Sequence, residues 1–119
     1  MRKRATAVII RGGKVLLVRD RGNTKFLLPG GAIENGESVA DAVKRELYEE
    51  LKLNTTKVTR LRERDYKSPV NEHKVCRVEV EGEPQASHEI DKFIWCDIKE
   101  PITIAVFSHV NNILKEIQE

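Results

Sequence analysis

Three glutamates in one short stretch are the residues of this chain that could do chemistry. Glu46, Glu49 and Glu50 are spaced three and four apart, so on a helix they would be neighbours. Two carboxylates at about 4 Å near a protein surface repel by about 4 kcal/mol at an effective dielectric of about 20. A bound cation reverses that sign, and Mg²⁺ and Mn²⁺ prefer carboxylate and carbonyl oxygens. A solvated acidic face with basic neighbours is the alternative interpretation.

The residues before these glutamates predict the helix that carries them. Ser38 and Asp41 have the spacing of a capping box, which predicts a helix beginning at about Val39. Helical periodicity places the apolar residues on one arc, namely Val39, Ala40, Val43, Leu47 and Leu51. Glu50 lies inside that arc. This position favours a metal-binding role over a solvated face.

A longer pattern includes the same glutamates. Eight residues match the fixed positions of G-x5-E-x7-R-E-U-x-E-E-x-G-U, where U is bulky and aliphatic: Gly31, Glu37, Arg45, Glu46, Leu47, Glu49, Glu50 and Leu53. This pattern is the Nudix box, and the chain resembles the Nudix hydrolases. The exception is Lys52, where the family has a glycine suited to a left-handed helix C-cap. Asn54 is predicted as the residue that could take over this role.

The resemblance implies hydrolysis of a pyrophosphate bond in a nucleoside diphosphate or triphosphate derivative, with Mg²⁺ or Mn²⁺ as cofactor. It implies that catalysis depends on a set of metal ligands: the carbonyl of Gly30 and the carboxylates of Glu46, Glu49 and Glu50. Glu46 or Glu50 would contact the attacking water. Glu37 and Arg45 would pair and hold the loop at Gly31 on the helix. Arg45 is therefore predicted both to support the site and to take part in catalysis.

Residues outside the motif complete the predicted site. Family members often bring a further acidic ligand from a loop before the last strand, and Glu89 is predicted for this role, with Asp91 as the alternative. Arg4 opens one predicted strand and Arg19 ends another, so both are predicted to bind the diphosphate. Plain surface charges are the alternative for both arginines.

The substrate remains open among several nucleotides. A nucleobase needs a flat apolar surface, for which Phe107 is predicted, with Tyr66 and Phe26 as alternatives. The short chain resembles family members that cleave nucleoside triphosphates, including oxidised ones, in a housecleaning reaction. ADP-ribose is a competing substrate because Pro69 lies sixteen positions after Leu53, and dinucleoside polyphosphates are a third. A Nudix fold kept as a nucleotide-sensing or partner-binding module is the non-catalytic alternative.

Composition limits the class of protein. The chain has 119 residues, 39% hydrophobic and 34% charged, which predicts one globular domain over residues 1–119. A net charge of +2 is too small to favour a nucleic-acid partner. The first apolar run, residues 7–10, is too short for a membrane span or a signal peptide. We therefore expect a cytoplasmic monomer or homodimer, with Cys76 and Cys96 as free thiols.

The remaining pattern predicts the elements that position the site. Residues 5–10 and 14–18 are predicted to form a hairpin around a Gly-Gly turn, as continuous apolar strands buried on both faces. Further strands are expected at 57–66, 73–80 and 92–96, and an amphipathic helix at 104–117. These elements fit an α/β/α sandwich with a mixed sheet between the acidic helix and the C-terminal helix. The Nudix resemblance implies the same fold.

Overall fold

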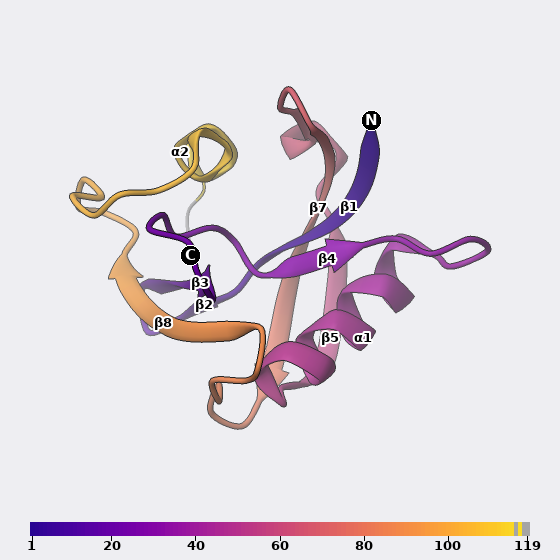
Figure 1. Ribbon diagram of the computed structural model, residues 1–119, viewed down its shortest axis with the longest axis horizontal. Helices are drawn as coiled ribbons and strands as arrows, with labels where there is room; N and C mark the ends of the chain where they lie inside the picture. The colour runs from indigo at the N-terminus through magenta and orange to yellow at the C-terminus, as the bar shows by residue number, and fades with distance from the viewer. Residues whose placement is uncertain (116, 118–119) are drawn as a thin grey trace.

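The strands of the chain form two sheets. In a computed structural model, which describes residues 1–115 and 117, the first sheet has the order β4-β1-β7-β5, with β6 also paired to β7 (Figure 1). Its strands are β1 (Arg2–Val8), β4 (Gly30–Ala32), β5 (Asn54–Arg60), β6 (Tyr66–Lys67) and β7 (Asn71–Glu81). The second sheet, β2-β3-β8, contains β2 (Ile10–Arg11), β3 (Lys14–Asp20) and β8 (Ile90–Asp97). Because β1 and β7 are parallel and the other pairs antiparallel, the first sheet is mixed.

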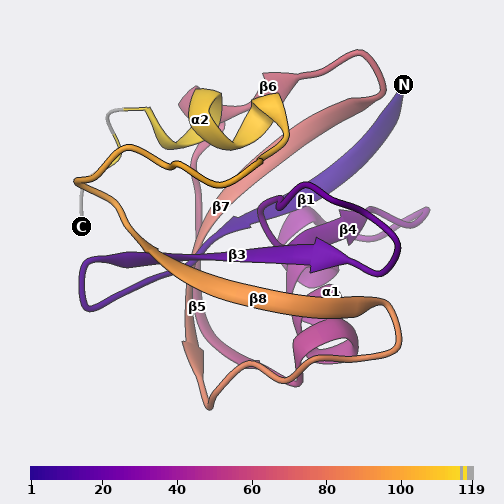
Figure 2. The same cartoon turned by 60° about the vertical axis from the view of Figure 1, so that its left-hand side comes forward.

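Two helices cover opposite sides of these sheets. Helix α1 (Val39–Leu51) packs on β1, β4 and β5, and α2 (Ser108–Leu114) lies on the other side, near β6 (Figure 2). A short 3-10 turn, η1 (Arg62–Arg64), follows β5. This arrangement is the predicted α/β/α sandwich, with the strands divided between two sheets. Within the residues described, no helix is long and apolar enough to cross a membrane.

Strand β3 joins the two halves of the hydrophobic core. Leu16 and Val18 pack in the cluster that includes α1, whereas Val15 and Leu17 pack in the cluster that includes α2. Side chains alternate between the two faces of a strand, so four consecutive apolar residues serve both clusters. All four are at most 1% exposed. The prediction that this run is buried on both faces is confirmed.

The predicted N-terminal hairpin is wrong in its extent. Only β2 pairs with β3 across the Gly-Gly turn, through Ile10 opposite Val15 and Arg11 opposite Lys14. Strand β1 instead joins the first sheet, where all seven of its residues pair with β7. The longer parallel pairing satisfies more backbone groups than a hairpin of the predicted length could.

Two other predicted elements are shorter than expected. The strand predicted over 57–66 runs from 54 to 60, and then Arg60 forms two hydrogen bonds with the Asp65 carboxylate, at 2.6 and 2.8 Å, across the η1 turn. The helix predicted over 104–117 begins only at Ser108, because Val106 forms a bridge with Phe26 in extended conformation. Residue 116 of that prediction, and residues 118–119 of the predicted domain, lie outside the described residues.

The two ends of α1 test the capping predictions. The Ser38 hydroxyl accepts a hydrogen bond from the Asp41 N–H at 3.0 Å, and the helix begins at Val39 as predicted. At the other end Lys52 adopts the left-handed conformation itself, with φ 59° and ψ 29°. The N–H of Lys52 donates to the Tyr48 carbonyl at 3.0 Å. The prediction that Asn54 takes this role is therefore wrong, since Asn54 begins β5.

The left-handed cap leads to a stability prediction. A left-handed conformation costs a non-glycine residue roughly 1–2 kcal/mol. Glycine avoids this strain, but part of the gain in stability is offset because glycine increases the conformational entropy of the unfolded chain. We expect Lys52→Gly to be more stable than Lys52→Ala by about 1 kcal/mol, measured by urea unfolding. The alanine variant is the matched control because both changes remove the contact of the Lys52 ammonium with the Tyr48 ring, at 5.1 Å. Equal stability of the two variants would show that the cap is unstrained.

Candidate active site

A cavity of about 690 Å³ opens beside α1, lined also by residues of β1 and β4, by residues around the end of β3 and by the segment just before β8. Acidic and basic side chains line it together. The acidic ones are Asp20, Glu46, Glu50 and Glu89, and the basic ones are Arg2, Arg4 and Arg21. We call this space the main cavity. Carboxylates suit a divalent cation and arginines suit phosphate oxygens, so the lining matches a metal bound together with an anionic ligand.

Two consecutive glycines form the floor of the main cavity. A Cβ added at Gly31 would lie 2.3 Å from the carboxyl carbon of Glu46, so only glycine lets this carboxylate lie against the β4 backbone. Gly30 has φ 143°, and a Cβ there would lie 2.0 Å from the Ala5 carbonyl oxygen on β1. Gly30 is thus required by strand packing, whereas Gly31 is required by the position of a functional side chain.

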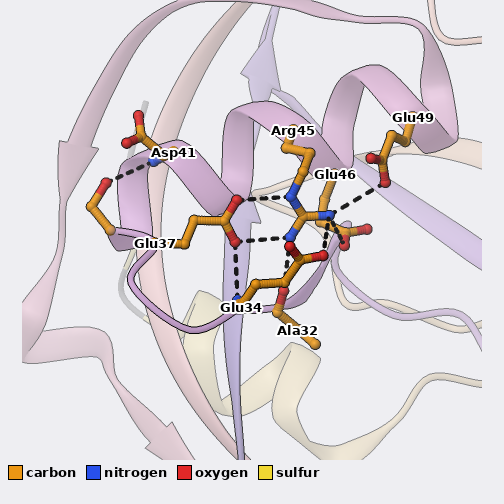
Figure 3. A network of polar contacts seen from close by, with 8 residues as sticks. Ala32, Glu34, Glu37, Asp41, Arg45, Glu46 and Glu49 are labelled. Atoms are coloured by element: carbon orange, nitrogen blue, oxygen red, sulfur yellow. Dashed lines mark hydrogen bonds and ion pairs between the residues drawn. The ribbon is translucent and has the colours of Figure 1, made fainter.

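Arg45 joins the loop before α1 to the carboxylates of the helix (Figure 3). Its guanidinium donates to both carboxylate oxygens of Glu37, at 2.8 and 2.9 Å, and to the carbonyl of Ala32 at 3.1 Å. It also donates to Glu46 at 2.8 Å. Hydrogen bonds from Arg45 and from the Glu34 N–H lower the pKa of Glu37 to about 2. The predicted Glu37–Arg45 pair is present, and it fixes one oxygen of Glu46.

Glu50 lies in a different electrostatic environment from the other helix carboxylates. Burial, followed by the charge of Glu46 and a hydrogen bond with Glu46, raises the pKa of Glu50 to about 9, although Arg4 opposes this change. Glu50 therefore keeps a proton at neutral pH when no cation is bound. A divalent cation between these two carboxylates would take the place of that proton.

Glu49 lies on the outer side of the main cavity. Its side chain is 56% exposed and accepts a hydrogen bond from Arg45 at 3.3 Å. It lines a neighbouring cavity that also includes Glu50 and Glu89. In residues 1–115 and 117, no three acidic, histidine or cysteine side chains converge closely enough to form a complete metal site. Carboxylate oxygens like these suit Mg²⁺ or Mn²⁺.

The two acidic residues proposed as a further ligand are separated by a β-bulge. Arg19 pairs with Lys92 whereas Asp20 pairs with Ile90, so the register shifts between them and Asp91 is left over. Asp91 accepts a hydrogen bond from Arg19 at 3.2 Å, whereas Glu89 lines the main cavity. The structure thus places Glu89, and not Asp91, beside Glu50.

The two arginines predicted to bind phosphate differ in position. Arg4 lines the main cavity, is 9% exposed and donates to the Leu28 carbonyl at 2.8 Å. Burial lowers its pKa, while Glu50, Asp20 and Glu46 oppose that change. Arg19 instead pairs with Asp91 and lies over the Phe26 ring at 5.5 Å, outside the lining of the main cavity. Two residues later Arg21 lines the cavity. It lies in a turn just after the end of β3, where strand alternation no longer sets the direction of a side chain, and no sequence pattern indicated it.

A second cavity of about 410 Å³ adjoins the first and shares four residues with it, Arg4, Asp20, Leu27 and Asn71. Phe107 lines this second cavity together with two histidines that the sequence analysis did not single out. The rings of His109 and His73 are stacked 4.3 Å apart, and the Phe107 ring lies 6.3 Å from His109 at an interplanar angle of 14°. The second cavity therefore offers flat rings next to the charged main cavity.

The stacked histidines are neutral. Nε2 of His109 accepts a hydrogen bond from the Leu28 N–H at 3.3 Å, so the proton of the neutral ring is on Nδ1. Burial, followed by His73 and Arg4, lowers the pKa of His109 to about 3. Burial, followed by Arg4, lowers the pKa of His73 to about 4. The sequence carried no signal for this pair, because the two histidines lie 36 positions apart and come together only in the folded chain.

The depressed pKa of His109 predicts acid sensitivity. Between its folded value of about 3 and an unfolded value of 6.5, the unfolded chain binds a proton that the folded protein does not, so stability falls as pH falls. We expect the stability advantage of the wild type over His109→Gln to shrink from pH 7 to pH 5. The slope should approach about 1.4 kcal/mol per pH unit, measured by urea unfolding. Glu50 is present in both proteins, and its raised pKa makes stability fall as pH rises. Its contribution is therefore removed when the stability of the variant is subtracted from that of the wild type. Parallel curves for the two proteins would contradict the prediction.

Comparison with known proteins extends the resemblance to nearly the whole chain. A family model described as NUDIX domain matches residues 1–114. The structure of a nudix hydrolase family member from Chromobacterium violaceum is 29% identical, with a TM-score of 0.83, covering 97% of this chain and 74% of that one. The E. coli ORF135 protein is 25% identical, with a TM-score of 0.81, covering 97% and 86%.

A MutT NUDIX hydrolase from Burkholderia pseudomallei has a TM-score of 0.77 and covers 98% of both chains, but at 21% identity it supports the fold alone. Among curated protein sequences none matches this chain significantly. The family match does not depend on one motif, since it also includes the strands and the second helix that complete both cavities. The chain therefore belongs to the Nudix hydrolase family.

Proposed function

We propose that this protein is a metal-dependent pyrophosphohydrolase that acts on a nucleoside diphosphate or triphosphate derivative. The observation that carries the proposal is the lining of the main cavity, where Glu46 lies against the Gly31 backbone beside Glu50. Arginine side chains share the same space. Carboxylates for a cation and arginines for phosphate oxygens are what hydrolysis of a diphosphate requires.

Different residues of the site would bind the metal, orient the water and hold the carboxylates in place. Glu46, Glu50 and Glu89 would hold Mg²⁺ or Mn²⁺, joined by Glu49 and the Gly30 carbonyl. When bound, the cation neutralises charge that develops on the diphosphate and lowers the pKa of a bound water. Glu46 or Glu50 would orient that water and accept its proton. Arg45 would keep Glu46 in place through the 2.8 Å hydrogen bond.

The phosphate groups would contact arginines that also line the main cavity. Arg4 is the central candidate because it is buried and already held by the Leu28 carbonyl, so little side-chain freedom is lost on binding. Arg2 lines the same space from the beginning of β1. Arg19 is not proposed for this role, since it is paired with Asp91.

The second cavity supports a nucleotide as the substrate. It adjoins the main cavity through Arg4 and Asp20, so a phosphate chain in one space can continue into a nucleoside in the other. Phe107 and His109 offer ring faces there. We propose a nucleoside triphosphate, including an oxidised one, cleaved to the monophosphate and pyrophosphate by a cytoplasmic enzyme. ADP-ribose is the second candidate because Pro69 lines this second cavity.

The test is hydrolysis of a substrate panel. The panel contains nucleoside triphosphates, oxidised dGTP, ADP-ribose and dinucleoside polyphosphates, each with Mg²⁺ and with Mn²⁺, and the products are separated by chromatography. Turnover of one class by the wild type, lost in Glu50→Gln, would support the proposal and identify the substrate. Metal and nucleotide binding without turnover would favour the non-catalytic binding module instead.

A further inference from the structure

Three consecutive backbone carbonyls in the segment before β8 accept hydrogen bonds from one residue, Arg21. Its N–H donates to the Glu89 carbonyl at 2.7 Å, Nε donates to the His88 carbonyl at 2.8 Å, and Nη2 donates to the Ser87 carbonyl at 3.1 Å. We call residues 87–89 the Glu89 segment. One arginine therefore contacts the whole backbone of this segment.

Further hydrogen bonds hold the two ends of the Glu89 segment. The Ser87 N–H donates to the Ile90 carbonyl at 2.9 Å, and the Ile90 N–H donates to the Ser87 hydroxyl at 3.1 Å. Just before the segment, the Gln85 N–H donates to the Leu51 carbonyl at the end of α1, at 2.9 Å. The backbone at Glu89 is thereby fixed relative to α1 and to the end of β3.

Holding Glu89 at this place has an electrostatic cost. Its side chain lines the main cavity together with those of Asp20 and Glu50. Where two of these carboxylates are charged and no cation is bound, they repel, so an unrestrained segment would let Glu89 move away from the main cavity. The three hydrogen bonds from Arg21 oppose that movement.

We propose that Arg21 is a positioning residue that holds Glu89 within reach of the cation bound by Glu46 and Glu50. This inference rests on the function proposed above. It assigns to Arg21 a role in metal affinity through the Glu89 backbone, and not through contact with the reacting atoms.

The chemistry of the side chain explains why an arginine is needed. A guanidinium presents donors in a fixed planar fork, so Nε and Nη2 reach two neighbouring carbonyls together. A lysine ammonium keeps the positive charge without the fork. Arg21→Lys therefore separates positioning from charge, because it should impair the first and preserve the second.

The experiment is a titration of Mn²⁺ without substrate, followed by the electron paramagnetic resonance signal of the free ion. We expect Arg21→Ala and Arg21→Lys to weaken Mn²⁺ binding roughly tenfold or more, as loss of an outer partner of a metal ligand does. Glu89→Gln should have a similar effect. The double variant Arg21→Ala with Glu89→Gln should be little worse than Glu89→Gln alone, since both changes act on one ligand.

Arg11 provides a matched control. It also donates to backbone carbonyls, that of Val80 in β7 at 3.2 Å and that of Gly82 at 3.0 Å, but it does not line the main cavity. Arg11→Ala should leave the Mn²⁺ affinity unchanged. Thermal unfolding by circular dichroism establishes that each variant is folded, and Arg21→Lys serves if Arg21→Ala does not fold.

The outcomes separate the two proposals. If Glu50→Gln loses Mn²⁺ while both Arg21 variants bind it like the wild type, the positioning role is overturned and the metal site stands. A folded Arg21→Lys with unchanged Mn²⁺ affinity, beside an Arg21→Ala that loses only nucleotide affinity, would also overturn it, in favour of direct phosphate contact. If Glu50→Gln itself binds Mn²⁺ normally, the proposed metal site fails and the role of Arg21 fails with it.

Discussion

Replacing Gly31 with alanine is expected to remove most of the hydrolytic activity and leave the fold intact. The new Cβ would lie 2.3 Å from the Glu46 carboxyl carbon and 2.5 Å from its Oε2, so this carboxylate must leave the β4 backbone. The far end of a glutamate side chain moves at small cost in stability. Displacing a catalytic group by about 1 Å can reduce turnover roughly 10²-fold. The measurement is kcat with Mg²⁺, together with the melting temperature.

Gly30→Ala is the neighbouring control with the opposite result. A Cβ there would lie 2.0 Å from the Ala5 carbonyl oxygen, and the backbone has φ 143°, which alanine rarely adopts. Because β1 and β4 must separate to admit it, we expect Gly30→Ala to destabilise the fold by about 2 kcal/mol or more. If Gly31→Ala kept full activity, the position of Glu46 on this glycine would not matter for function.

Glu50→Gln is expected to change activity and metal-free stability in opposite directions. Turnover should fall roughly 10²- to 10⁴-fold, as on loss of a group that handles the proton of the attacking water. We expect millimolar Mg²⁺ to raise the melting temperature of the wild type, because a cation in the proposed site would bind the folded state, and we expect this rise to disappear in Glu50→Gln. A purely structural acidic helix predicts unchanged turnover in this variant.

The metal-free stability follows from the raised pKa of Glu50. Between an unfolded value of 4.5 and a folded value of about 9, the folded protein holds a proton that the unfolded chain lacks, so stability falls as pH rises through this range. Glutamine removes this loss. In a metal chelator, the stability gain of Glu50→Gln should grow by up to about 1.4 kcal/mol per pH unit from pH 6 to pH 8.5. Glu49→Gln, which removes a carboxylate from a largely exposed side chain of the same helix, is the matched control.

Local chemistry determined which features the sequence could predict. The Ser38 cap, the start of α1 and the pairing of Glu37 with Arg45 all depend on residues within one turn or one loop of each other. The cap and the helix start follow from helical geometry and turn chemistry, whereas the pairing of Glu37 with Arg45 was implied by the family resemblance.

Features that depend on strand register could not be predicted in the same way. Arg19 lies in β3 and pairs with Asp91, whereas Arg21 lies just beyond the end of β3, and no residue type marks where that strand ends. The departure of β1 to the first sheet likewise depends on pairing with β7, far along the chain. Lys52 adopts a conformation that its residue type disfavours, since the contacts at the end of α1 require it.

The main cavity takes its residues from both sheets, with Arg4 and Gly30 in the first and Asp20 at the end of β3 in the second. A ligand bound there joins the two sheets, so they cannot separate locally without releasing it. Amide hydrogen exchange should then slow together in β4 and in the paired ends of β3 and β8 when metal and nucleotide bind. Ligand binding at this cavity would thus slow the local opening of strands that are not hydrogen-bonded to one another.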